Sequence, residues 1–178
     1  MTDVENAPRP IKLAHVVLRT SRFAESVAWW KNALQAEVRH EDEVLAFLTY
    51  DDEHHRLAIL NAPGMADNGR ASAGMEHLAF TFANLDDLLA QYERLAAEGI
   101  LPIAPINHGM TLSMYYEDPD RNQVEFQIDT MTADEAAAFM ASDVFAANPI
   151  GVLYDPADLV ERRGGGESIQ SLVAYVPQ

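Results

Sequence analysis

The sequence predicts an α+β fold in which two βαβββ modules pair into one curled mixed sheet, an open barrel with a shared cavity. Short runs rich in β-branched residues alternate with two segments whose apolar residues recur every three or four positions. The order of these elements repeats: an offset of 62 residues aligns His15 with His77 and Trp30 with Tyr92. Each half holds one helix and a small sheet, too little to bury its own core, so the halves are expected to share one.

The first module is predicted over residues 11–62, after a polar, proline-containing leader at residues 1–10. Its helix is expected over 21–34, where one apolar face is formed by Phe23, Val27, Trp30 and Leu34. Its strands are expected where apolar and β-branched residues cluster, at 11–18, 36–41, 44–50 and 55–60. A loop rich in Pro, Gly, Asn and Asp follows at 61–74.

The second module is predicted over residues 72–129. Asn84 is suited to cap its helix and Gly99 to end it, because Asn accepts from free backbone N–H groups and Gly tolerates the left-handed conformation. Strands are expected at 75–82, 101–106, 111–116 and 123–128. The sequence Asp-Pro-Asp-Arg-Asn at 118–122 predicts the turn between the last two.

Residues 130–178 do not repeat and form a C-terminal extension. A helix is predicted over 132–140, where Thr132 and Glu135 have the spacing of a capping box. A short helix is expected near 156–163. The extension can wrap the barrel, close the cavity or meet a second subunit, and the sequence leaves all three open.

Composition excludes several functional classes. The formal net charge is −16, with 28 acidic against 12 basic residues, which argues against binding nucleic acid or an anionic membrane surface. There is no cysteine, so disulfide scaffolds and thiolate metal ligands are excluded. No apolar run approaches the roughly 18 residues of a membrane span, and the N-terminal residues lack a secretory apolar region. A cytoplasmic protein that binds a small aromatic ligand agrees with these observations.

Three residues suggest a metal site. His15 and His77 occupy equivalent positions in the two modules, and Glu125 stands between Val124 and Phe126 in a predicted strand. A single strand histidine is usually a core residue, but the repeat and the buried acid together favour ligation. A carboxylate in an apolar environment needs a nearby cation. Two imidazoles and one carboxylate are the ligand set of non-haem Fe(II) centres with open coordination sites.

The duplicated pattern with these three residues resembles the vicinal oxygen chelate superfamily, which includes glyoxalase I, antibiotic-resistance proteins and type I extradiol ring-cleaving dioxygenases. The extradiol signature is a His, then a large apolar residue with Tyr, an acidic-Pro turn and the ligand Glu. The matching residues here are His108, Met114, Tyr115, Asp118, Pro119 and Glu125. Arg121 stands where the family usually has Gly, so the geometry of the turn is the point of departure.

A second stretch, residues 51–60, is similar to the His-His strand of the biphenyl-2,3-diol dioxygenases. That resemblance implies that His55 is the active-site acid/base. In a regular strand His54 and Arg56 would share one face, so alternation alone does not choose between His54 and His55.

The resemblance implies an Fe(II)-dependent extradiol dioxygenase, with Mn(II) as the less favoured metal. Its substrates would be O₂ and a small catechol-type diol, and its product a muconic-semialdehyde-type compound. His55 would act as base and then acid, Tyr115 would hydrogen-bond a substrate oxygen, and His108 would hold the substrate or shape the proton path. Tyr116 should point away from the site and pack. A homo-oligomer is expected by analogy alone.

Two alternatives remain within the same fold. One is a binding protein that sequesters an aromatic compound or antibiotic without turnover. The other is a glyoxalase-like isomerase or lyase, which would use a fourth ligand, a carboxylate at the end of the first module. The position equivalent to Glu125 is Ala58 or a neighbour, Leu57 or Ile59, and none of these binds metal.

Overall fold

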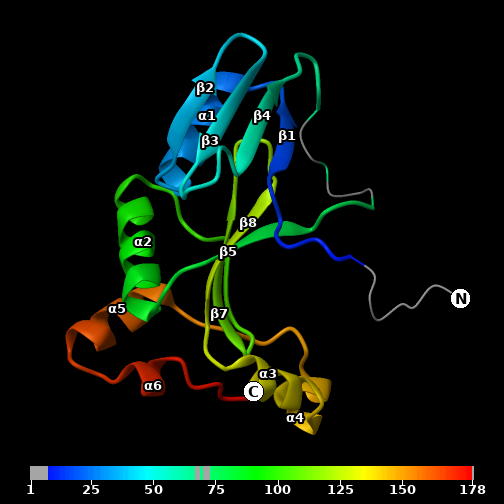
Figure 1. Cartoon of the computed structure of the whole chain (residues 1–178). Helices are drawn as coiled ribbons and strands as arrows, with labels where there is room; N and C mark the ends of the chain where they lie inside the picture. The colour runs from blue at the N-terminus through cyan, green and yellow to red at the C-terminus, as the bar shows by residue number, and fades with distance from the viewer. Residues whose placement is uncertain (1–7, 67–68, 70–72, 178) are drawn as a thin grey trace, which may run out of the picture. The chain divides into compact units, whose positions relative to one another are not determined.

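The computed structural model describes residues 8–66, 69 and 73–177, and the chain divides into two compact units, Met1–Asn68 and Gly69–Gln178 (Figure 1). The described strands form two sheets, one of four strands and one of five, and neither is closed. The predicted α+β class is confirmed, and each unit contains one βαβββ module. The pairing of the two modules into a single curled sheet stays a prediction. The predicted leader lies outside the described residues at 1–7, as does the proposed start of the second module at residue 72.

The first unit has the strand order β1-β4-β3-β2, with β1 parallel to β4 and the other pairs antiparallel. The helix packs against β4 and buries Val27 and Trp30, two residues of the predicted apolar face. The bounds are β1 Val16–Thr20, α1 Phe23–Ala33, β2 Glu37–Glu41, β3 Leu45–Thr49 and β4 Leu57–Asn61.

The predicted first strand, 11–18, was wrong at its start, because β1 begins at Val16. A strand needs a partner, and the first pair between β1 and β4 is Val16 with Leu57. The preceding apolar residues are not packed in a sheet: Ile11 is 95% exposed and Leu13 is 74% exposed. His15 therefore lies one residue before the strand instead of within it.

The second unit has the order β5-β8-β7-β6-β9. Its helix begins as predicted, since the Asn84 side chain accepts a hydrogen bond from the backbone N–H of Asp87 at 2.9 Å. Gly99 follows the helix with φ 78°, the left-handed conformation expected of it. The bounds are β5 His77–Thr81, α2 Leu85–Ala97, β6 Ala104–Asn107, β7 Thr111–Glu117 and β8 Gln123–Asp129.

The C-terminal extension adds to the second sheet. Its short strand β9, Val152–Leu153, pairs antiparallel with β6. The sequence did not predict this strand, because two residues are too few to show a periodic pattern. The predicted capping box is present between Thr132 and Glu135. The helices are α3 Ala133–Met140, α4 Asp143–Ala147, α5 Pro156–Gly164 and α6 Ile169–Leu172. Among the described residues, no helix is both long and apolar enough to cross a bilayer.

The turn between β7 and β8 accommodates Arg121 in the place of the usual glycine. Its φ is 67°, in the left-handed region that favours glycine. The buried carboxylate of Asp118 supports the turn by accepting hydrogen bonds from the backbone N–H groups of Asp120 at 2.9 Å and Asn122 at 2.8 Å. Arg121 therefore adopts, just before β8, the backbone conformation that a glycine would favour at this position.

Candidate active site

Glu125 lies in the middle of β8 and is 5% exposed. Its neighbours across the sheet are Ala79 on β5 and Tyr115 on β7. Its Oε2 atom is 3.0 Å from Nε2 of His77, the first residue of β5. A buried carboxylate with an imidazole nitrogen beside it offers two ligand atoms, an oxygen and a nitrogen, of the types that bind Fe(II) and Mn(II). This pair therefore fits the expected metal.

Tyr115 joins this pair to His108. The Tyr115 ring meets the His77 ring edge-on, with centroids 5.3 Å apart. Its hydroxyl oxygen is 3.0 Å from Nε2 of His108. Burial raises the pKa of the Tyr115 hydroxyl, and the charge of Glu125 and a hydrogen bond to that carboxylate raise the pKa further. Tyr115 therefore keeps its proton at neutral pH and acts as a hydrogen-bond donor.

The extension fixes the orientation of His108, which lies in the loop between β6 and β7. Nδ1 of His108 is 2.5 Å from the carbonyl oxygen of Ile150, and because a carbonyl only accepts, Nδ1 carries the proton. In the neutral ring Nε2 is then an acceptor, so the single hydroxyl proton of Tyr115 is donated either to Nε2 of His108 or to the Glu125 carboxylate. The next residue, Gly109, has φ 87° and packs so closely against the Phe139 ring of α3 that a Cβ atom would lie 2.5 Å from it.

In the first unit His15 is exposed, and its ring lies against that of His55 with centroids 4.4 Å apart. His55 also stacks on Phe47 of β3, with centroids 4.4 Å apart and 23° between the planes. Burial lowers the pKa of the His55 imidazole, and the neighbouring rings of His15 and His54 lower the pKa further. A neutral imidazole at physiological pH is suited to accept a proton.

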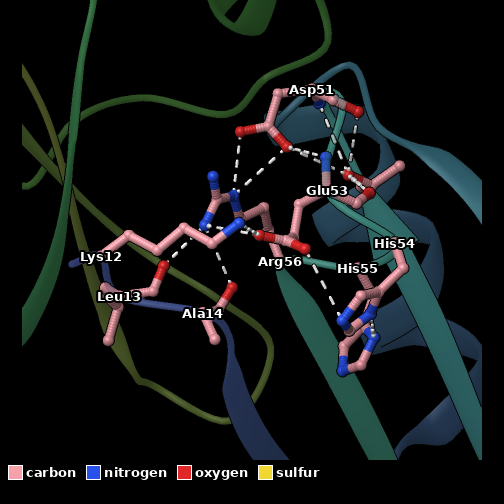
Figure 2. Close-up of polar contacts among 9 residues, drawn as sticks. Lys12, Leu13, Ala14, Asp51, Glu53, His54, His55 and Arg56 are labelled. Atoms are coloured by element: carbon pink, nitrogen blue, oxygen red, sulfur yellow. Dashed lines mark hydrogen bonds and ion pairs between the residues drawn. The ribbon is translucent and has the colours of Figure 1, made fainter. Parts of the chain in front are cut away.

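The geometry favours His55 over His54. The loop of residues 51–56 precedes β4, so strand alternation does not govern the two histidines. The His54 side chain is 68% exposed and its Nε2 lies 3.6 Å from Glu53 (Figure 2). His55 is the one that contacts His15.

The structure thus groups the predicted residues by unit. His77, Glu125, Tyr115 and His108 are in contact in the second unit, and His15 with His55 in the first. Within the described part of the chain, no group of three or more His, Asp and Glu side chains is arranged to hold a metal ion. The set of His15, His77 and Glu125 therefore stays a prediction from the repeat.

The sheet registers show what the two modules share. Val17 pairs with Ala58 in the first sheet as Ala79 pairs with Glu125 in the second, so Ala58 stands where the second module has its acid. Across the antiparallel pair, Phe47 faces Ala58 as Tyr115 faces Glu125. The first module therefore offers an apolar counterpart of the carboxylate position, as the sequence indicated.

Sequence reasoning missed three contributors. Phe47 could have been found by aligning the third strands of the repeat. Arg56, adjacent to His55, binds main-chain carbonyl groups, and the Ile150 contact also involves a main-chain carbonyl. Such contacts leave no pattern in a sequence.

Comparisons with known proteins identify related sequences and structures. The family profile described as Glyoxalase/Bleomycin resistance protein/Dioxygenase superfamily matches residues 12–126. The chain is 45% identical over 166 residues to biphenyl-2,3-diol 1,2-dioxygenase 2 of Rhodococcus globerulus. This alignment covers 92% of the chain and 87% of that protein. It is 39% identical over 158 residues to biphenyl-2,3-diol 1,2-dioxygenase 3 of the same organism, with 87% and 83% covered.

Solved structures show the same fold. A glyoxalase/dioxygenase from Nostoc punctiforme superimposes with a TM-score of 0.58 at 17% identity, over 68% of this chain and 92% of that one. At this identity the likeness concerns the fold alone.

Proposed function

Because the chain belongs to the Glyoxalase/Bleomycin resistance protein/Dioxygenase superfamily, we propose that it is an extradiol dioxygenase that cleaves a catechol-type diol with O₂. Its relatives of 45% and 39% identity are named biphenyl-2,3-diol 1,2-dioxygenases, which supports an aromatic diol as substrate. The expected product is of the muconic-semialdehyde type.

One observation carries the proposal: the buried Glu125 carboxylate lies 3.0 Å from the His77 imidazole, beside the Tyr115–His108 hydrogen bond. A protein that only sequesters an aromatic ligand has no need of a buried carboxylate among imidazoles, since burying that charge costs several kcal/mol without a cation. A glyoxalase-like enzyme would need a fourth ligand, where the first module has Ala58.

We propose Fe(II) as the metal, with Mn(II) second, and His15, His77 and Glu125 as its ligands. When bound, the ion supplies open coordination sites for both catechol oxygens and a path for electrons to O₂. The first unit contributes His15 by its equivalence to His77 in the repeat. The absence of a carboxylate at Ala58 is consistent with the three-ligand set.

His55 would take a proton from a catechol hydroxyl and later return it to an oxygen of the opening ring. Its lowered pKa keeps the imidazole neutral and ready to accept. The Phe47 stack holds the ring in one orientation. In the second unit Tyr115 would donate a hydrogen bond to a substrate oxygen, its single hydroxyl proton turning from Nε2 of His108 to the substrate.

The test is oxygen uptake by Fe(II)-loaded protein, prepared without air, on addition of 2,3-dihydroxybiphenyl and other catechols. Oxygen consumption with a yellow ring-fission product is expected. Neither colour nor oxygen uptake with any catechol would favour the ligand-binding alternative.

The role of His55 has its own test. The His55→Ala variant should keep its iron and lose most turnover, whereas His40→Ala on β2, whose side chain is 51% exposed and pairs with Asp42, should keep both. Loss of iron from His55→Ala would show that the acid/base assignment is wrong.

A further inference from the structure

The Arg56 side chain contacts the segment that precedes His15 and the loop that carries His55. Nη1 of Arg56 donates hydrogen bonds to the carbonyl oxygens of Leu13 at 2.6 Å and Ala14 at 3.1 Å, the two residues before His15 (Figure 2). Nε of the same guanidinium donates to the Asp51 carboxylate at 2.9 Å. Arg56 itself directly follows His55.

The segment before β1 is held by few side-chain contacts. Residues 8–15 belong to no helix or strand, and the exposed Ile11 and Leu13 supply no packing. An ion pair between Lys12 and Glu53 is a second tie to the same loop. A side chain that binds two successive carbonyl groups next to His15 therefore restricts the position of that residue.

The loop that carries His55 is ordered by the same residue. The backbone N–H of Arg56 donates to the Leu48 carbonyl at 2.8 Å, and its carbonyl accepts from the N–H of Val16 at 3.0 Å. Asp51, the partner of the guanidinium, also accepts from the backbone N–H of Glu53 at 3.0 Å. Arg56 thus contacts β3, the start of β1 and the 51–56 loop at once.

Guanidinium chemistry suits this task. Arginine presents five N–H donors in a rigid plane, so one edge can bind a carboxylate while another binds carbonyl groups. The compact ammonium of lysine has three donors at one point and cannot reproduce that arrangement. The Arg56 side chain is 21% exposed, so water competes less for these bonds than on an open surface.

We propose, on the basis of the function proposed above, that Arg56 is a positioning residue. Its guanidinium holds the segment of His15 against the loop of His55, and so keeps the proposed metal ligand and the proposed acid/base group 4.4 Å apart, centroid to centroid. Residues that orient ligands in this way typically change metal affinity or activity by roughly 10–100-fold when replaced.

The test compares Arg56→Lys with Arg39→Lys. The control makes the same change on β2, the edge of the sheet away from β1, where Arg39 forms a 3.2 Å surface ion pair with Glu37. Fe(II) affinity is measured by chelator competition without air, and kcat and KM are measured for 2,3-dihydroxybiphenyl. For Arg56→Lys we expect Fe(II) affinity and kcat each to fall roughly 10–100-fold, with KM changed less than about threefold. Arg39→Lys should match the unchanged protein.

Nuclear Overhauser contacts between the imidazole protons of His15 and His55, in metal-free protein, give a readout that needs neither iron nor turnover. They should be equally strong in the unchanged protein and in Arg39→Lys, and weaker in Arg56→Lys, where the backbone bond from Val16 to the carbonyl of residue 56 remains but the guanidinium bonds are lost. If the unchanged protein cleaves no catechol, the proposed function fails, while these contacts still decide whether Arg56 positions the two rings. Contacts and affinity retained in Arg56→Lys would overturn the inference.

If Arg56→Lys does not fold, Asp51→Asn replaces it. This variant keeps the size of the side chain and its bond to the Glu53 N–H but removes the charge that holds Nε. A partial loss of the ring contacts and a loss of Fe(II) affinity of about 10-fold, the lower end of the range for such residues, are expected. Behaviour identical to the unchanged protein would count against the role of Arg56.

Discussion

Replacing Glu125 by glutamine separates a metal ligand from a structural residue. The substitution keeps the size of the side chain and a carbonyl oxygen that can still accept from Nε2 of His77, which lies 3.0 Å from the carboxylate. In metal-free protein we therefore expect the free energy of unfolding to stay the same or to rise, because the neutral amide keeps this contact and removes the cost of a buried charge. In the presence of metal the outcome should differ, because the neutral amide would bring no charge to the ion.

The size of the difference follows from binding linkage. At a free Fe(II) concentration 100 times Kd, binding stabilises the folded protein by about 2.7 kcal/mol. If loss of the charged ligand raises Kd by about 100-fold, the gain at the same concentration falls to about 0.4 kcal/mol. For a protein of 178 residues the difference of about 2.3 kcal/mol corresponds to roughly 5–9 °C in Tm.

The assay is thermal unfolding without air, with and without Fe(II), for the unchanged protein, Glu125→Gln and Glu98→Gln. Glu98 is a matched control, since its side chain is 51% exposed and its Oε1 lies 3.7 Å from Arg94 at the end of α2. The control should gain as much from Fe(II) as the unchanged protein. An equal gain for Glu125→Gln would refute its role as a ligand.

Three further changes test separate parts of the structure. Arg121→Gly should raise the urea midpoint, with a gain of about 0.5–1 kcal/mol, because it relieves a φ of 67°; a lower midpoint would contradict this. Tyr115→Phe should keep its iron and lower kcat roughly 100-fold through loss of one donated hydrogen bond; unchanged turnover would remove the hydroxyl from the reaction. Gly151→Ala would place a Cβ 2.3 Å from a backbone carbonyl of β6 and should destabilise the fold by about 1–3 kcal/mol and lower turnover through His108. Gly166→Ala, also at positive φ but with no atom within 4 Å of the added Cβ, should keep its turnover; an equal loss there would exclude the clash as the cause.

Elements with strong local patterns were predictable. The helix α2 combines a regular apolar face with a capping Asn84, and both determine its start irrespective of the rest of the chain. Glu125 was noticeable because an acid between apolar residues in a strand needs an explanation, and the structure buries it. The equivalence of His15 and His77 was found by aligning the two modules, since the number of residues between two histidines is not by itself a specific signal.

Features that depend on distant partners were not predictable. The apolar run at 11–15 has strand-like composition, but the start of β1 is set by where β4 begins, at Leu57. The strand β9 exists because it can pair with β6. The two bonds from Arg56 reach carbonyl groups 43 and 42 positions away in the chain, and any residue there would have supplied the same acceptor.

X-ray absorption at the iron edge of Fe(II)-loaded protein tests most directly whether His15, His77 and Glu125 bind a single ion. The unchanged protein should show oxygen and nitrogen ligands with two imidazoles. The His15→Ala variant, in which the second unit is intact, should show only one. Two imidazoles around the iron in His15→Ala, or none in the unchanged protein, would contradict the proposed site.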